Sequence, residues 1–86
     1  MPSERKLFQQ VVKKSISLKQ RREMVREIGR LNGVEQLETL TRTNGIDGAL
    51  RRDAVSELKS LRATDALEAI AADGTVDDAI RKRAQL

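Results

Sequence analysis

The chain has 86 residues, a length suited to one domain, and its 17 Lys and Arg against 13 Asp and Glu give a net charge of +4. It contains no Cys or His, which excludes disulfides, Cys/His metal sites and catalysis by a His base or a Cys nucleophile. No apolar run approaches the roughly 20 residues of a membrane span. We therefore expect one cytoplasmic domain, residues 1–86, with no membrane contact. Because Cys and His are missing, we also expect that it is not an enzyme and uses no cofactor or metal.

The first two predicted helices each bury one apolar side. The first covers residues 3–14, where Leu7 and Val11 face inward one helical turn apart and Phe8 is a further candidate. The second covers residues 18–31 and is stopped by the Asn-Gly dipeptide that follows. Its apolar side chains fall on one side at helical spacing: Leu18, Val25, Ile28 and Leu31.

The remaining predicted helices repeat this arrangement. A shorter helix at residues 34–43 presents Leu37 and Leu40 and ends at a glycine-containing break. The pair recurs at residues 48–61 and 64–72, and a last helix starts near residue 78. No segment alternates apolar and polar residues over a useful length, so strands are not expected.

A 30-residue repeat relates these elements. Residues 19–48 and 49–78 align without a gap and share eight identities, which pair Arg21 with Arg51, Arg22 with Arg52, Val25 with Val55, Glu27 with Glu57, Leu31 with Leu61, Leu37 with Leu67, Glu38 with Glu68, and Asp47 with Asp77. The same spacing places Ser17, Asp47 and Asp77 before amphipathic runs, where their side-chain oxygens are predicted to cap a helix. The expected fold is all-α: a short right-handed α-solenoid of three hairpins, at about residues 3–31, 34–61 and 64–86.

The repeat resembles a known family. Residues 47–70 contain D-x-x-x-R-R-x-A-V-x-x-L in one helix and A-L-x-x-I in the next, a pattern similar to the HEAT-like repeats of the phycobilisome-lyase type. The chain departs from it at Met24, where a small Ala is usual, at Gly29 in mid-helix, and at Leu86, where the last repeat is cut off. The resemblance implies stacked hairpins whose second helices line a partner surface. It does not imply lyase activity, because the repeat is a scaffold for many functions.

Three arginines fall within the apolar faces of the longer helices. They are Arg21, Arg51 and Arg81, spaced by 30 residues. An inward-facing guanidinium needs acceptors, so each is predicted to bond to carbonyl groups or to an aspartate at a helix start, with Asp47 and Asp77 as candidates. We expect these five residues to form a structural ladder between repeats.

The outward basic residues of the longer helices are the predicted partner-binding face: Arg22, Arg26, Arg30, Arg52, Lys59 and Lys82. The shorter helices are acidic by contrast, with Glu35, Glu38, Asp65 and Glu68. Three interpretations of the basic face are open: a solvated charged surface, a contact with an acidic protein, and a contact with the nucleic-acid backbone.

An acidic protein is the partner we predict. Phe8 is the only aromatic residue, so single-stranded bases would have no stacking platform. The predicted function is therefore a protein-interaction scaffold or adaptor, with non-sequence-specific nucleic-acid binding as the alternative. Weak self-association is a further alternative, through the open ends of a short solenoid at Leu7 and Phe8 or at Ala84 and Leu86.

Overall fold

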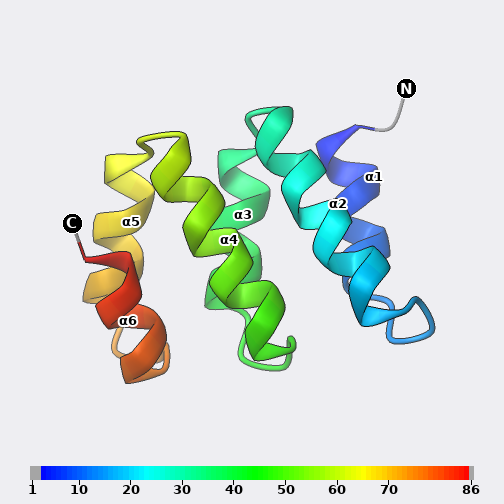
Figure 1. Ribbon diagram of the computed structural model, residues 1–86. Coiled ribbons are helices and arrows are strands. Elements are labelled where there is room, and N and C mark those ends of the chain that lie inside the picture. The colour runs from blue at the N-terminus through cyan, green and yellow to red at the C-terminus, as the bar shows by residue number, and fades with distance from the viewer. Residues whose placement is uncertain (1–2, 86) are drawn as a thin grey trace.

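The computed structural model describes residues 3–85, and its regular structure in that range is entirely α-helical (Figure 1). The helices of this range are α1 (Glu4–Val11), α2 (Leu18–Arg30), α3 (Val34–Arg42), α4 (Gly48–Ser60), α5 (Thr64–Ala72) and α6 (Asp78–Ala84). The prediction of an all-α chain with six helices is confirmed. Leu86, which closes the last predicted hairpin, lies outside the described residues.

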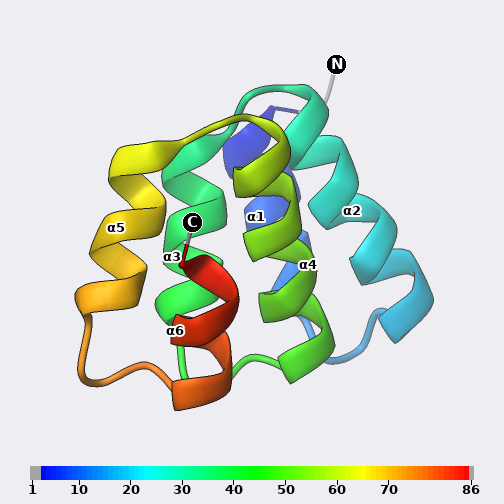
Figure 2. The same cartoon turned by 60° about the vertical axis from the view of Figure 1, so that its left-hand side comes forward.

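The helices are arranged in two layers. Within each hairpin α1 packs on α2, α3 on α4, and α5 on α6. Helices α2, α4 and α6 also contact one another in that order and form the layer nearer the viewer in Figure 1. Helices α1, α3 and α5 form the layer behind. Figure 2 shows both layers from the end made by α5 and α6. The layer of α2, α4 and α6 carries the residues of the predicted basic face.

One apolar core runs through all three hairpins. Repeat-related positions are buried together: Leu37 and Leu67 are both fully inaccessible to solvent, as are Val25 and Val55. The helical spacing of these side chains gives each helix an apolar stripe, and burial of the stripes stabilises the stack. The buried apolar residues are Leu7, Val11, Val25, Ile28, Leu37, Leu40, Leu50, Ala54, Val55, Leu58, Ala66, Leu67, Ile70, Val76, Ile80 and Ala84.

Two of the three predicted helix caps are present. Ser17 Oγ accepts a hydrogen bond from the Gln20 amide at 3.2 Å, and Asp47 Oδ1 accepts one from the Ala49 amide at 2.8 Å. The prediction is wrong for Asp77, whose side chain makes no capping bond. Its carboxylate accepts a hydrogen bond from a guanidinium of the preceding hairpin instead.

The C-termini of α2 and α4 share one turn geometry. Asn32 and Arg62, related by the 30-residue repeat, have positive φ angles of 60° and 54°. In both turns the next amide donates to the carbonyl five residues earlier, at 2.9 and 3.0 Å, as in a Schellman motif. Asn tolerates the left-handed region, but a side chain such as that of Arg costs about 1–2 kcal/mol there. Residue 62 is therefore a position of local strain.

Two details differ from the sequence-based expectation. Leu18 was expected on the apolar side of the second helix but is 37% exposed. It is the first residue of α2, and the corresponding first residues of α4 and α6 are Gly48 and Asp78, so this position faces away from the core in every hairpin. The first helix ends at Val11 instead of residue 14.

Gly29 marks a close approach of α2 and α4. A Cβ atom at this position would lie 2.9 Å from Cδ of Glu57, well inside normal contact distance. Gly29 is buried and lies in the last turn of α2, one residue before its end, and not in mid-helix as expected from the sequence. The glycine thus accommodates the Glu57 side chain from the neighbouring hairpin.

Candidate interaction surface

All six predicted partner-binding residues lie on the layer formed by α2, α4 and α6. Five of them are exposed, and Arg22 is half-buried. Helix α2 carries Arg22, Arg26 and Arg30, α4 carries Arg52 and Lys59, and α6 carries Lys82. The i, i+4 spacing along α2 aligns its three arginines on one side of that helix.

Arg22 is bound within the protein. Its guanidinium makes a two-pronged contact with the Asp53 carboxylate, with Nε–Oδ2 at 2.8 Å and Nη2–Oδ1 at 3.2 Å. The hydrogen bond to Asp53 and the charge of that carboxylate raise the pKa of Arg22 above its ordinary value. Fork-to-fork pairs of this kind fix geometry as well as charge. Arg22 therefore joins α2 to α4, and its charge is already compensated.

The other basic residues divide into one paired and four unpaired side chains. Arg30 forms an ion pair with Glu27 on its own helix. Within residues 3–85, no carboxylate lies within ion-pairing distance of the remaining four, which are Arg26, Arg52, Lys59 and Lys82. The four unpaired residues are thus distributed over α2, α4 and α6. Sequence patterns alone did not separate them from the paired ones.

The acidic side chains of the layer formed by α1, α3 and α5 are also partly neutralised. The residue responsible is Arg42, which the sequence analysis did not single out. Arg42 Nη1 donates to Glu38 at 2.7 Å and Arg42 Nε donates to Asp73 at 2.9 Å. These bonds raise the pKa of Arg42. The hydroxyl and the amide of Thr75, at 2.6 and 2.9 Å, together with Arg42, lower the pKa of Asp73 to about 2. Arg42 therefore links α3 to the loop that follows α5.

The contacts between neighbouring hairpins share one sequence spacing. The ion pairs Arg22–Asp53 and Arg42–Asp73 each join residues 31 apart. A hydrogen bond from Asn44 Nδ2 to the Thr75 carbonyl, at 3.1 Å, spans the same interval. A search of the sequence for opposite charges 31 residues apart would have found both ion pairs, together with Arg26 and Glu57, for which residues 3–85 show no ion pair.

Arg51 is the buried member of the predicted ladder. It is 3% exposed, and its guanidinium makes three hydrogen bonds. Nε donates to the Thr41 carbonyl at 3.0 Å, Nη2 to Asn44 Oδ1 at 3.2 Å, and Nη1 to Asp77 Oδ2 at 3.2 Å. Thr41 lies in the last turn of α3, where carbonyls lack helical partners. Arg51 therefore caps α3, holds the loop after it and reaches the third hairpin.

The two other ladder arginines have different surroundings. Arg21 and Arg81 are half-buried, and within residues 3–85 the Nε of each has no hydrogen-bond partner. Arg21 and Asp47 line one groove of about 360 Å³ without an ion pair between them. Arg81 forms an ion pair with Asp78 on its own helix. In the described part of the chain, only Arg51 makes the ladder contact between hairpins.

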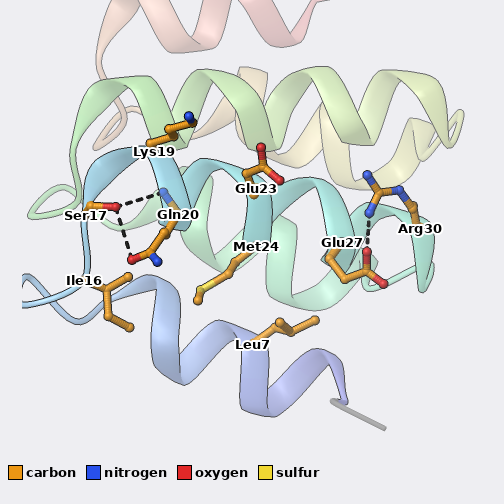
Figure 3. A pocket seen from close by; sticks show the side chains of 9 residues that line it. All are labelled: Leu7, Ile16, Ser17, Lys19, Gln20, Glu23, Met24, Glu27 and Arg30. Atoms are coloured by element: carbon orange, nitrogen blue, oxygen red, sulfur yellow. Dashed lines mark hydrogen bonds and ion pairs between the residues drawn. The ribbon is translucent and has the colours of Figure 1, made fainter.

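A surface groove of about 930 Å³ lies on the outer side of the first hairpin (Figure 3). Its apolar floor is formed by Leu7, Ile16 and Met24, which lie between α1 and α2. The repeat-related positions of Leu7 and Met24 in the second hairpin are Leu37 and Ala54, which are fully buried. The groove of the first hairpin thus corresponds to a surface that is buried in the second hairpin.

The apolar residues expected at the open ends are less accessible than a binding surface requires. Leu7 is buried and Phe8 is half-buried, and the large apolar side chains that are exposed in the first hairpin are Val12 and Leu18. At the other end Ala84 is buried, and Leu86 lies outside the described residues.

Residues 3–85 contain no cluster of three or more acidic side chains placed to hold a metal ion. No helix in this range combines the length and apolar character needed to cross a membrane. Comparisons with protein-family models, curated proteins and solved structures found no significant match.

Proposed function

We propose that the protein is a short right-handed α-solenoid of HEAT-like hairpins that acts as a non-enzymatic interaction scaffold, contacting an acidic protein through α2, α4 and α6. Three features support the solenoid: two parallel layers of helices, a core that continues through repeat-related positions, and three polar contacts between hairpins that recur at a spacing of 31 residues. A constant spacing is what translation along a solenoid produces.

The distribution of counterions supports the choice of partner. Arg26, Arg52, Lys59 and Lys82 are exposed on one layer, and within residues 3–85 none has an ion-pair partner. Carboxylates on a partner would complement these charges, which speeds association and sets the orientation of the complex. Arg22 and Arg30, predicted to belong to this face, already have internal carboxylate partners and contribute less in this proposal.

The position of the single aromatic residue favours a protein over a nucleic acid. Phe8 lies on α1 and lines a small groove with Glu35 and Thr39 of α3, on the opposite layer from the unpaired cations. Nucleic-acid bases would therefore meet charge without a stacking surface. Binding to nucleic acid would then depend on phosphate contacts alone and would fall steeply with salt.

Charge reversal on one layer tests the partner surface. The variant Arg26→Glu/Arg52→Glu/Lys59→Glu should bind a fluorescein-labelled decaglutamate peptide at least about tenfold more weakly than the unmodified protein. The control carries the same charge change at three exposed residues outside this layer, Lys6→Glu/Lys13→Glu/Lys14→Glu. Equal losses in both variants would contradict the proposed surface. Tight binding to a random DNA duplex that drops by orders of magnitude between about 50 and 200 mM salt would establish the nucleic-acid alternative.

Insertion of one more repeat tests the solenoid. A second copy of residues 49–78, placed directly after the first, should add a long and a short helix and raise the urea midpoint, because stacked repeats gain one more interface. Circular dichroism should show more helical signal per molecule in proportion. A closed bundle has no place for an extra hairpin, so an insertion that leaves the added residues unfolded would contradict the solenoid.

A further inference from the structure

We propose that Arg52 of α4 and Arg83 of α6 form a carboxylate-binding site, in which an Asp or Glu side chain of the acidic partner takes the position that Asp53 occupies between α2 and α4. This inference rests on the proposed function, because it assumes an acidic protein partner. It names the two residues at the centre of that contact and the chemical group that they bind.

The spacing of the hairpin contacts places the two arginines opposite each other. Arg22 of α2 meets Asp53 of α4, 31 residues later, and the same interval recurs in the contacts between the second and third hairpins. Helix α4 packs on α6 as α2 packs on α4. The residue 31 positions after Arg52 is Arg83, so the repeat sets a second arginine at the position that corresponds to Asp53.

The electrostatics of this pair favour a bound anion. Both side chains are exposed, and within residues 3–85 neither has an ion-pair partner. Two like charges on neighbouring helices repel each other. A carboxylate between them removes this repulsion and offers two oxygens to planar guanidinium groups, which bind carboxylates in two-pronged fashion.

The backbone leaves room for the Arg52 guanidinium. At Gly48, the first residue of α4, an added Cβ atom would lie 3.0 Å from Arg52 Nη1. The Arg52 side chain therefore folds back over the start of α4, one turn before its own Cα atom. The same direction brings Arg22 to its contact with Asp53 on the neighbouring helix.

A single substitution tests both the geometry and the ligand. Arg83→Asp supplies a carboxylate at the proposed site from within the chain, so Arg52 should acquire an internal partner. We expect the melting temperature to rise by roughly 2–4 °C, as for a modest exposed ion pair. Binding of the decaglutamate peptide should fall at least about tenfold, because the internal carboxylate occupies the site.

Lys13→Asp is the matched control, because it makes the same change in charge at an exposed residue outside the layer of α2, α4 and α6, which within residues 3–85 has no ion-pair partner. We expect it to weaken peptide binding less than about threefold, because it changes only the long-range electrostatic field of the protein, which salt screens. It should leave the melting temperature unchanged. The Arg52→Ala change should abolish the thermal gain of Arg83→Asp, which would demonstrate the direct contact.

The outcomes separate this inference from the proposed function. Equal losses of binding in Arg83→Asp and Lys13→Asp would overturn the site, because binding would then follow net charge and not this pair of arginines. A thermal gain that persists without Arg52 would also overturn it. Failure of the unmodified protein to bind the peptide would overturn both proposals. Loss of duplex DNA binding alone in Arg83→Asp would assign the site to phosphate and contradict the carboxylate.

Discussion

Replacement of Arg51 by alanine should destabilise the protein more than any change to an exposed arginine. The substitution removes three hydrogen bonds, to the Thr41 carbonyl, the Asn44 side chain and the Asp77 carboxylate. Their importance differs because their surroundings differ. Thr41 is fully buried, whereas the Asp77 side chain is 69% exposed and Asn44 is also exposed. Water can replace the guanidinium at the two exposed acceptors but cannot reach the Thr41 carbonyl.

The size of the effect follows from this difference. A buried acceptor left without a donor costs about 1–3 kcal/mol, whereas an ion pair with an exposed carboxylate contributes about 0–1 kcal/mol. Loss of the buried alkyl part of the side chain adds about 1–2 kcal/mol. Arg51→Met keeps most of that apolar volume. We therefore expect Arg51→Met to lower the free energy of unfolding by about 1–3 kcal/mol, and Arg51→Ala by about 1–2 kcal/mol more.

Urea denaturation followed by circular dichroism measures both variants against a neighbouring control. Arg52 follows Arg51 on the same helix but is exposed and unpaired within residues 3–85, so Arg52→Ala should change the free energy of unfolding by no more than about 0.5 kcal/mol. Equal losses from Arg51→Ala and Arg52→Ala would refute the assignment of Arg51 as the buried link between α3 and its neighbours.

Three further predictions concern single positions. Arg62→Gly should stabilise the protein by up to about 1 kcal/mol in thermal or urea unfolding, because residue 62 has a φ of 54°, and a loss of stability would contradict the inferred strain. Gly29→Ala should gain up to about 1 kcal/mol from helix propensity, and more of this gain should appear when Glu57→Ala removes the side chain that an added Cβ would contact. An identical effect in both backgrounds would show that the contact is unimportant. The pKa of Asp73 is lowered from 3.8 to about 2, so its stabilising effect is complete above about pH 4 and is lost as the pH falls through about 2. In acid titrations of the unfolding midpoint, Asp73→Asn should remove this part of the pH dependence, and an unchanged dependence would refute the assignment.

The local structure could be predicted from the sequence because its determinants are close together in the chain. Helix α5 has the expected bounds, and α2 and α4 end within one residue of them. Apolar residues recur at helical spacing, and a cap such as Ser17 acts on an amide three residues away. The inward position of Arg51 could be predicted for the same reason, since it lies among the apolar residues of a single helix.

Other features depended on how complete hairpins pack. Asp77 has the sequence position of a cap but binds Arg51, because the third hairpin brings its carboxylate to that guanidinium. Gly29 interrupts a helix pattern without explanation until Glu57 is seen to occupy the space. Leu18 fits the apolar stripe by spacing, yet it lies at the helix end where no neighbouring element covers it.

The sequence by itself thus determined six helices, their repeat and the residues that face the core. The tertiary structure decided which charges are compensated, and hence which ones are left for a partner. Arg22 and Arg52 are equivalent in the repeat, but only Arg22 has a carboxylate 31 residues later. That interval reflects which faces of α2 and α4 meet. The choice of faces is set by the packing of many side chains across the layer, and no local pattern in the chain encodes it.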